Sequence, residues 1–408
     1  MSAETSSHAD DAPLAGVGGI ERAQGVAAAY TGRTLALMGA DVIKIERPGS
    51  GDALRGDGPP LDQQFNVGPM FGYLNVNKSG VTLDLATVQG RKLLDEMLAK
   101  AEMFIDDTHP SERAAAGIAP DELCKKHPHL VYVSVLPYGA MGAHSDYRGY
   151  ELNEFHSGGE GYLLPNGLAI EMFPERPPVK IYGHFAELNG GTSAVSAAIA
   201  ALLVQPDVGG QFVDVSVQDA NVAISCFALQ RLGEGVLEHR HARSFQYGGV
   251  LECSDGYVQL LTLEQHQWEG LVKLMNDPAW ALEPALNDPL VRARRGPEIN
   301  KHIRAWAKTQ KFEDVVKRGQ ELSVPLAKYA EPAELLASAQ TRERAMFANV
   351  DLPGLGPTPV LMAPNQFSLP KSLRGGPAKP GADNTRVLGE WLGHSAAEIE
   401  QWSCAGAV

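Results

Sequence analysis

The stretch "MFIDDTHPSERAAAGIAPDELCKKHPHLVYVSVLPYG", residues 103–139, decides the fold class. It contains two short apolar runs, "MFIDD" (103–107) and "LVYVSVLPYG" (130–139), with a helical pattern around "PDELCKKHP" (120–128) between them. Short apolar runs bounded by turn residues are typical of buried strands. Two strands separated by a helix pair in parallel, because the helix crosses over the sheet between them. The stretch therefore predicts one strand–helix–strand unit of an α/β fold.

Both flanks of this stretch repeat the alternation. Helices are predicted at 27–38 and 87–102, and strands at 42–45, 80–85 and 210–219. In the second helix, "TVQGRKLLDEMLAKAE", the apolar residues fall on one face, as in a helix that packs against a sheet. The sequence up to about residue 220 therefore predicts a parallel sheet covered by helices.

With 408 residues the chain is too long for one ordinary core, so two domains are expected. Residues 1–12 are predicted to form a disordered tail and residues 13–224 the first part of a large α/β domain. Residues 225–330 have strands ("GVLECSDGYVQLL") and helices ("WEGLVKLMND", "EINKHIRAWAKT") of their own and are predicted to form a small domain. Residues 331–408, with a Pro/Gly-rich crossing segment at 353–380 and a terminal helix, are predicted to complete the large domain.

Charge and composition exclude several functions. A formal net charge of -14 argues against nucleic-acid or anionic-membrane partners, which bind basic surfaces. The start "MSAETSSHADDAP" has no signal-peptide pattern, and the longest apolar run, Ala194–Val204, is too short to span a membrane. The four cysteines form no CxxC pair, and the histidine cluster "EHRHAR" (238–243) lacks metal-ligand spacing. We therefore expect a cytoplasmic protein with reduced thiols and no metal site.

Two segments carry cations that suit a phosphate group. "KIERPGSGDALR" places Lys44, Arg47 and Arg55 around a glycine-bearing loop after a strand. Arginine side chains and free backbone amides bind phosphate, but a solvated turn explains the same pattern. "NVNKSGVTLDL" adds Lys78 ahead of a strand, which by itself is typical of a turn.

Two other segments carry acids. "GYELNEFHSGG" contains Glu151, Glu154 and His156, interpreted as exposed polar groups of a loop, with a ligand role as the alternative. "HFAELNGGTSAVSAAIAALL" (184–203) places Glu187 and a glycine pair directly before an Ala-rich apolar run. An acid at a helix start either stabilises the helix dipole or acts as a reagent, and spacing alone favours the first role.

Several stretches together resemble the family III CoA-transferases, a group that includes formyl-CoA and carnitine CoA-transferases and α-methylacyl-CoA racemase. The resemblance rests on "LMGADVIKIERPGSGD", "NKSGVTLDLATVQGRKLL", "HLVYVSVLPYG", "GGQFVDVSVQDA", "SDGYVQL" and "NTRVLGEWLGHSAAEIE". It runs from about Pro13 to the C-terminus in the family's order. It implies a large Rossmann-like α/β domain, a smaller α+β domain and an interlocked dimer.

The resemblance also implies a nucleophile. In this family an aspartate in a stretch like "IADLAAG" attacks the thioester, and "FAELNGG" aligns with it without a gap, so that Glu187 takes the aspartate's position. The implied reaction forms a mixed anhydride and then an enzyme–CoA thioester, from which an acceptor carboxylate takes the CoA. The substrates are an acyl-CoA and a carboxylic acid, and no other cofactor is implied.

The residues that contact CoA in the family are only partly retained. Arg47 matches an arginine at the nucleotide, Leu83 a leucine at the adenine, and Lys78 keeps its place in "NKRS". The family's "ENFRPG" is "DDTHPS" here, which puts Asp107 in place of a nucleotide-contacting asparagine, and a phosphate-contacting arginine is Ala115. A gained carboxylate and a lost cation both weaken phosphate binding.

Two hypotheses follow from the resemblance. In the first, the chain is a non-catalytic subunit paired with a homologous catalytic chain, as in succinyl-CoA:benzylsuccinate CoA-transferase. In the second, it is a self-sufficient homodimeric transferase with Glu187 as nucleophile. A racemase is disfavoured because the His–Asp pair of that activity is Tyr150 and Glu151 here. The glycine-rich loop that shields the site in formyl-CoA transferase is reduced to "YGG" (247–249).

Overall fold

The computed structural model describes residues 12–56, 67–166, 169–170, 173–235, 239–240, 247–369 and 373–408. They form two compact units: the first runs to Gly159 and includes Ile181–Ser225 and Ala339–Val408, and the second comprises Glu160–Lys180 and Cys226–Ser338. The structure thus groups Glu160–Lys180 with the second unit, whereas the sequence analysis placed this segment in the large domain. Of the predicted tail, residues 1–12, only Ala12 belongs to the described residues.

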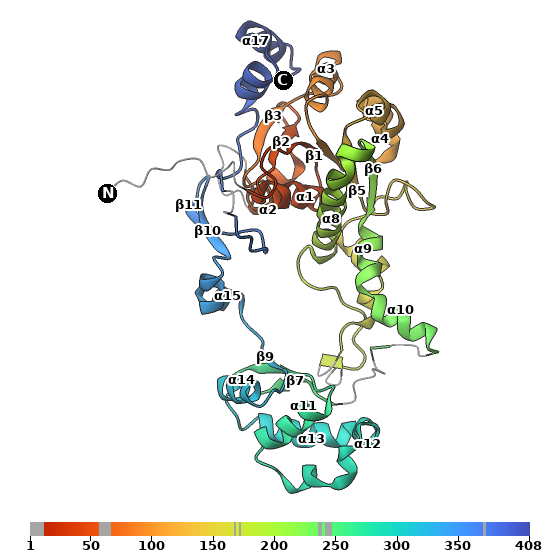
Figure 1. Cartoon of the computed structure of the whole chain (residues 1–408), viewed down its shortest axis with the longest axis vertical. Coiled ribbons are helices and arrows are strands. Elements are labelled where there is room, and N and C mark those ends of the chain that lie inside the picture. Colours follow the sequence, from red (N-terminus) through yellow and green to blue (C-terminus); the bar gives the residue numbers. More distant parts are fainter. Residues whose placement is uncertain are drawn as a thin grey trace, which may run out of the picture. The chain divides into compact units, whose positions relative to one another are not determined.

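A six-stranded parallel sheet forms the centre of the first unit, in the order β3-β2-β1-β4-β5-β6 (Figure 1). Its strands are β1 (Gly18–Arg22), β2 (Asp41–Glu46), β3 (Ser79–Thr82), β4 (Met103–Asp106), β5 (Val131–Leu136) and β6 (Phe212–Ser216). Every neighbouring pair is parallel. This is the strand order of a doubly wound Rossmann-like sheet, which confirms the predicted fold class.

Helices cover both faces of this sheet (Figure 1). On one face, α1 (Val26–Leu37) and α8 (Phe185–Val208) pack against each other and against the strands. On the other, α3 (Val88–Leu98) and α5 (Pro120–Lys126) share a core with the sheet that includes Phe104. The apolar face predicted for α3 is confirmed, because its leucines and Met97 are buried there.

The central strand β1 is missing from the sequence-based prediction. Its sequence, "GGIER", contains two glycines and two charged residues, which hide the apolar pattern of a buried strand. Glu21 in this strand is 0% exposed and needs buried counter-charges, which the neighbouring elements provide.

The glycine pair of α8 sets how closely this helix approaches its neighbours. A Cβ on Gly190 would lie 2.7 Å from Val217, the first residue of α9 (Val217–Ile224). A Cβ on Gly191 would lie 2.6 Å from the carbonyl oxygen of Ala27 in α1. The two glycines therefore allow close helix packing, and the contact at Gly191 fixes the start of α8 beside the start of α1.

By length and composition α8, with 24 residues, is apolar enough to cross a membrane. It contains Pro206 and packs against α1, α6 (Glu151–Ser157), α9 and strands β5 and β6. These contacts are those of a helix within a globular unit.

The other elements of the first unit connect and flank the sheet: η2 (Ala53–Gly56), α2 (Pro69–Leu74), α4 (Pro110–Ala116), α16 (Ala339–Glu343), β10 (Phe347–Leu352), β11 (Gly356–Leu361), η6 (Thr385–Trp391) and α17 (Ala396–Cys404). Strands β10 and β11 form an antiparallel hairpin, so the predicted crossing segment at 353–380 begins with regular structure. The terminal helix predicted at 384–393 corresponds to η6.

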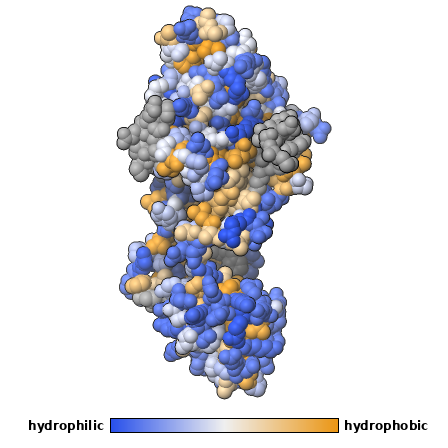
Figure 2. Space-filling view, turned by 90° about the vertical axis from the view of Figure 1, so that its left-hand side faces the viewer, coloured by the Kyte–Doolittle hydropathy of each residue, from blue (hydrophilic) through white to orange (hydrophobic). Residues whose placement is uncertain are grey.

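The second unit has an antiparallel sheet, β7 (Gly249–Glu252), β8 (Tyr257–Leu260) and β9 (Leu326–Lys328), and its own core around Trp268. Its helices are η3 (Glu160–Leu163), α10 (Cys226–Gly233), α11 (Gln265–Leu274), η4 (Ala279–Leu282), η5 (Pro284–Asn287), α12 (Pro289–Arg294), α13 (Gly296–Ala307), α14 (Phe312–Glu321) and α15 (Pro332–Ala337). It is the predicted α+β unit. The face of this unit that Figure 2 shows, at the bottom of the view, is mostly hydrophilic.

Candidate active site

A cavity opens in the first unit where the carboxyl ends of β1 and β4 meet. Its walls come from the segments that follow β1, β4 and β5, together with Glu154, Glu187 and Val217, and its volume is about 360 Å³. We call it the central cavity. Connections after β1 and β4 run to opposite sides of the sheet, and such a switch point is where doubly wound proteins bind ligands.

A second cavity of about 350 Å³, which we call the outer cavity, lies beyond the carboxyl ends of β2 and β3. It is lined by Arg47, Leu83 and Ala115, three of the positions that the family resemblance connects with the CoA nucleotide. Arg22 and Glu112 line both cavities. The two cavities are therefore neighbours along the carboxyl edge of one sheet.

Glu187 lies in the first turn of α8 and lines the central cavity. Its Oε2 is 2.5 Å from Nδ1 of His184, and its side chain is 14% exposed. The backbone N–H of Glu187 donates to the carboxylate of Glu151 at 3.1 Å. Glu151 thus places a negative charge at the start of α8, the role that spacing alone assigned to Glu187.

Glu154 follows Glu151 by one turn of α6 and also lines the central cavity. It is 3% exposed, and its Oε2 is buried without a hydrogen-bond partner. Burial, with the charges of Glu187 and Glu151 nearby, raises the pKa of Glu154 to about 8. The interpretation of this segment as an exposed loop is wrong for both glutamates, since the segment is a helix, whereas His156 is exposed.

Asp107 lies at the start of α1, where it lines the central cavity. Its Oδ2 accepts the backbone N–H groups of Gln24 at 2.8 Å and Gly25 at 2.6 Å. Burial and the adjacent Asp106 raise the pKa of Asp107 to about 7, although the two amides favour its charged form. The carboxylate that replaces the family's asparagine thus also anchors a helix start.

Lys78 lines neither cavity and is buried directly before β3, the edge strand of the sheet. Its Nζ is 2.7 Å from Glu21 Oε2 and donates to the Ala29 carbonyl at 2.8 Å and to Asn75 Oδ1 at 3.0 Å. Burial and the neighbouring ammonium of Lys44 lower the pKa of Lys78 to about 8. Lys78 is therefore placed as a counter-charge to Glu21.

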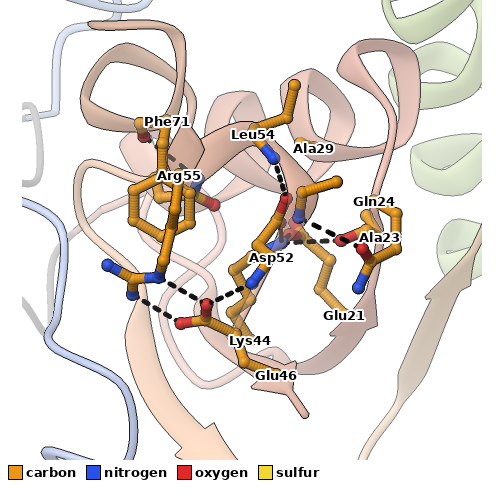
Figure 3. A network of polar contacts seen from close by, with 12 residues as sticks. Glu21, Ala23, Gln24, Ala29, Lys44, Glu46, Asp52, Leu54, Arg55 and Phe71 are labelled. Atoms are coloured by element: carbon orange, nitrogen blue, oxygen red, sulfur yellow. Dashed lines mark hydrogen bonds and ion pairs between the residues drawn. The ribbon is translucent and has the colours of Figure 1, made fainter. Parts of the chain in front are cut away.

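Two cations of the predicted phosphate loop, Lys44 and Arg55, are also counter-charges to buried carboxylates (Figure 3). Lys44 contacts Glu21 at 3.1 Å and Asp52 at 2.6 Å, and Arg55 binds both oxygens of Glu46 at 2.6 Å. These groups are buried ion pairs. Arg47, the third cation of this loop, is exposed and lines the outer cavity. Of the three cations in this loop, Arg47 is therefore the one whose charge is available to a phosphate group.

The sequence analysis missed Arg22 and His184. Arg22 ends the unpredicted strand β1 and lies 3.4 Å from Asp106, at the junction of the two cavities. His184 is three residues before Glu187, a spacing that brings two side chains together on one helix face and could have pointed to it. In the part of the chain that the structure describes, no group of three or more His, Cys, Asp or Glu residues is arranged to hold a metal ion.

Comparisons with known proteins agree with this geometry. A sequence model described as CoA-transferase family III matches residues 14–384. The β subunit of succinyl-CoA–L-malate CoA-transferase from Chloroflexus aurantiacus is 26% identical over 95% of this chain and 96% of its own length. Formyl-CoA:oxalate CoA-transferase from Streptomyces avermitilis is 25% identical over 92% of this chain and 94% of its own length.

Solved structures show the same fold. A CaiB/BaiF family protein from Brucella suis superimposes with a TM-score of 0.79 at 25% identity, over 93% of this chain and 99% of its own. Rv3272 from Mycobacterium tuberculosis, in an orthorhombic crystal form, superimposes with a TM-score of 0.79 at 21% identity, over 92% of this chain and 99% of its own.

Proposed function

Because the chain belongs to CoA-transferase family III, we propose that it moves coenzyme A between carboxylic acids with the Glu187 carboxylate as nucleophile. The observation that supports this role is the position of Glu187. Its side chain lines the central cavity, while Glu151 supplies the charge at the start of α8. A carboxylate in a cavity at the switch point is available to react with a ligand bound there.

The proposed reaction begins with attack of a Glu187 oxygen on the thioester carbonyl carbon of the donor. The new C–O bond forms as the carbonyl π electrons move to oxygen, and collapse of this intermediate breaks the C–S bond to give a mixed anhydride and CoA thiolate. The thiolate then attacks the Glu187 carbonyl and releases the donor acid. The acceptor carboxylate repeats these steps in reverse and leaves as the new thioester.

The two cavities offer a position for each end of the substrate. The nucleotide of CoA is assigned to the outer cavity, with Arg47 toward a phosphate and Leu83 beneath the adenine. The thioester then reaches the central cavity past Arg22, which lines both. Lys78 has no direct contact with CoA in this arrangement, because its charge is directed to Glu21.

A second candidate is a subunit that acts together with a homologous chain. The Chloroflexus relative is itself named a β subunit, which supports this candidate. The apolar surface that α8 exposes near its end, where Leu203 is 78% and Val208 is 65% exposed, suits a partner chain of either kind, identical or homologous. In the second candidate an aspartate of the partner carries the chemistry. An interlocked dimer, and succinyl-CoA with an aromatic succinate such as benzylsuccinate as the exchanged pair, stay predictions.

A pair of substitutions separates the two candidates. If Glu187 is the nucleophile, Glu187→Gln abolishes transfer by the purified chain, because an amide cannot form the anhydride, and Glu187→Asp keeps the carboxylate that the family uses. Circular dichroism and a CoA-binding measurement serve as controls for folding. If Glu187→Gln turns over at the wild-type rate in a complex with a homologous chain, the nucleophile is in the partner.

A further inference from the structure

Glu154 is a buried carboxyl group that the proposed reaction does not yet use. Several buried side-chain atoms in the described residues lack a hydrogen-bond partner. Among them, Oε2 of Glu154 is the one whose residue lines the central or the outer cavity. An unsatisfied polar atom costs free energy in the empty protein, and because Glu154 lines the cavity, a hydrogen bond from its carboxyl group to a ligand there removes that cost.

The surroundings of Glu154 are acidic. On its own helix it faces Glu151, and from α8 it faces Glu187. Helix α9 also packs against α6, but its only acid, Asp219, is exposed, and Asn221 contacts the end of α6 at Gly158. Among the described residues, no cation contributes to the shift in the pKa of Glu154, which burial and these two carboxylates raise to about 8. At neutral pH the group is therefore an uncharged acid with an O–H donor.

From this geometry we propose that Glu154 is a catalytic residue whose carboxylic acid O–H donates a hydrogen bond to the carbonyl oxygen of the thioester as Glu187 attacks it. The inference rests on the proposed role of Glu187. Glu154 and Glu187 both line the central cavity, and they stand on helices α6 and α8, which pack against each other. The proposal places the carbonyl oxygen of a thioester attacked by Glu187 on the side of the cavity that Glu154 lines.

The chemistry needs such a donor. Attack by Glu187 moves the carbonyl π electrons onto oxygen, and a fixed donor stabilises the negative charge that develops there. Glu154 keeps its proton throughout, so no proton is transferred. A charged Glu154 could only accept a hydrogen bond, and it would also repel both the attacking carboxylate and the forming oxyanion. Activity must therefore fall as the group ionises.

The test compares Glu154→Gln, which keeps an N–H donor that does not titrate, with Glu154→Met, which fills a similar volume without a donor. With succinyl-CoA and acetate as probes, the rate of the wild-type chain falls with one-proton dependence above about pH 8. Glu154→Gln loses this limb and keeps measurable transfer. Glu154→Met lowers kcat by about 10²–10³-fold with little change in KM. Asp219→Asn, an exposed acid of α9, is the matched control and keeps the alkaline limb.

Infrared difference spectroscopy adds a readout that is independent of turnover. At pH 7 the spectrum of the wild-type chain minus that of Glu154→Gln shows the carbonyl band of one protonated carboxyl group, and Asp107→Asn, which removes the other carboxyl group with a raised pKa, leaves this band in place. The inference is overturned if the alkaline limb persists in Glu154→Gln, if Glu154→Met retains the wild-type kcat, or if the infrared band is absent from this difference spectrum. Failure of the proposed function looks different: the wild-type chain shows no transfer with any donor, while the infrared band is unaffected.

Discussion

Replacement of Lys78 by methionine tests whether this residue stabilises the fold or binds CoA. Methionine keeps the length and apolar stem of lysine and removes the ammonium. In the native chain that ammonium has three partners, Glu21, the Ala29 carbonyl and Asn75. Both charged members of the pair are buried, with side-chain exposures of 1% for Lys78 and 0% for Glu21.

The size of the effect follows from the charges around this pair. Lys44, Lys78 and Arg55 face the three carboxylates of the buried network: Glu21, Asp52 and Glu46. Without Lys78, Glu21 and Asp52 share the ammonium of Lys44, and one negative charge stays uncompensated. Loss of one partner of a buried ion pair costs about 3–5 kcal/mol, a large part of the total stability of most domains.

The assay must report on the first unit alone, since two units need not unfold together. Amide hydrogen exchange followed by mass spectrometry on peptides that cover β1 and β2 provides this, because both strands border Lys78. Exchange in these peptides is expected to accelerate by about two to four orders of magnitude in Lys78→Met. The double variant Glu21→Gln/Lys78→Met restores the charge balance and recovers part of the protection.

The reasoning is refuted if Lys78→Met exchanges as slowly as the wild-type chain and binds CoA ten times more weakly or worse. That result would make Lys78 a CoA ligand, as the family resemblance implies, and would remove it from the structural network.

Four further predictions concern the cavities and the packing. Arg47→Ala weakens CoA binding by about 1.5–3 kcal/mol in titration calorimetry without changing hydrogen exchange, because Arg47 is exposed and lines the outer cavity. CoA affinity of the wild-type chain falls between pH 6 and pH 8 as Asp107 ionises with a pKa of about 7, whereas Asp107→Asn shows no such fall in the same titration. Folding raises the pKa of Glu154, so between the unfolded and the folded pKa the native state binds more protons than the unfolded state. The free energy of unfolding therefore falls by up to about 1.4 kcal/mol per pH unit as pH rises toward 8. Urea unfolding of Glu154→Gln is expected to show a weaker dependence on pH. Gly191→Ala lowers the free energy of unfolding by about 1–3 kcal/mol, since its Cβ would meet the Ala27 carbonyl oxygen at 2.6 Å.

The sequence was sufficient to predict those elements that follow a simple period. The apolar residues of β4 and β5 lie side by side, those of β2 cluster at Val42–Ile45, and α3 has a clear apolar face, so pattern and structure agree. Strand β1 escaped because its buried charge is neutralised by lysines from elsewhere in the sequence, and no local pattern reveals such a pairing. The hairpin of β10 and β11 escaped because prolines in β11 suggest irregular structure.

The sequence could point to candidate site residues that match a family position. It could not predict the roles of residues whose function depends on the groups packed around them. Arg47, Leu83 and Glu187 all line cavities at the carboxyl edge of the sheet, and their roles toward CoA and the thioester stay predictions. The roles of Glu151 and Glu154 depend on which helix amide or empty space each carboxylate meets, and this is fixed only when α6 packs against α8.

The central claim, that Glu187 is the nucleophile, is tested most directly by trapping its intermediate. The purified chain is incubated with succinyl-CoA, treated with hydroxylamine, digested and analysed by tandem mass spectrometry, with Glu187→Gln as the control. The account predicts a hydroxamate on Glu187 that depends on the acyl-CoA and is absent from the variant. An unmodified Glu187 in a preparation that is transferring CoA would contradict it.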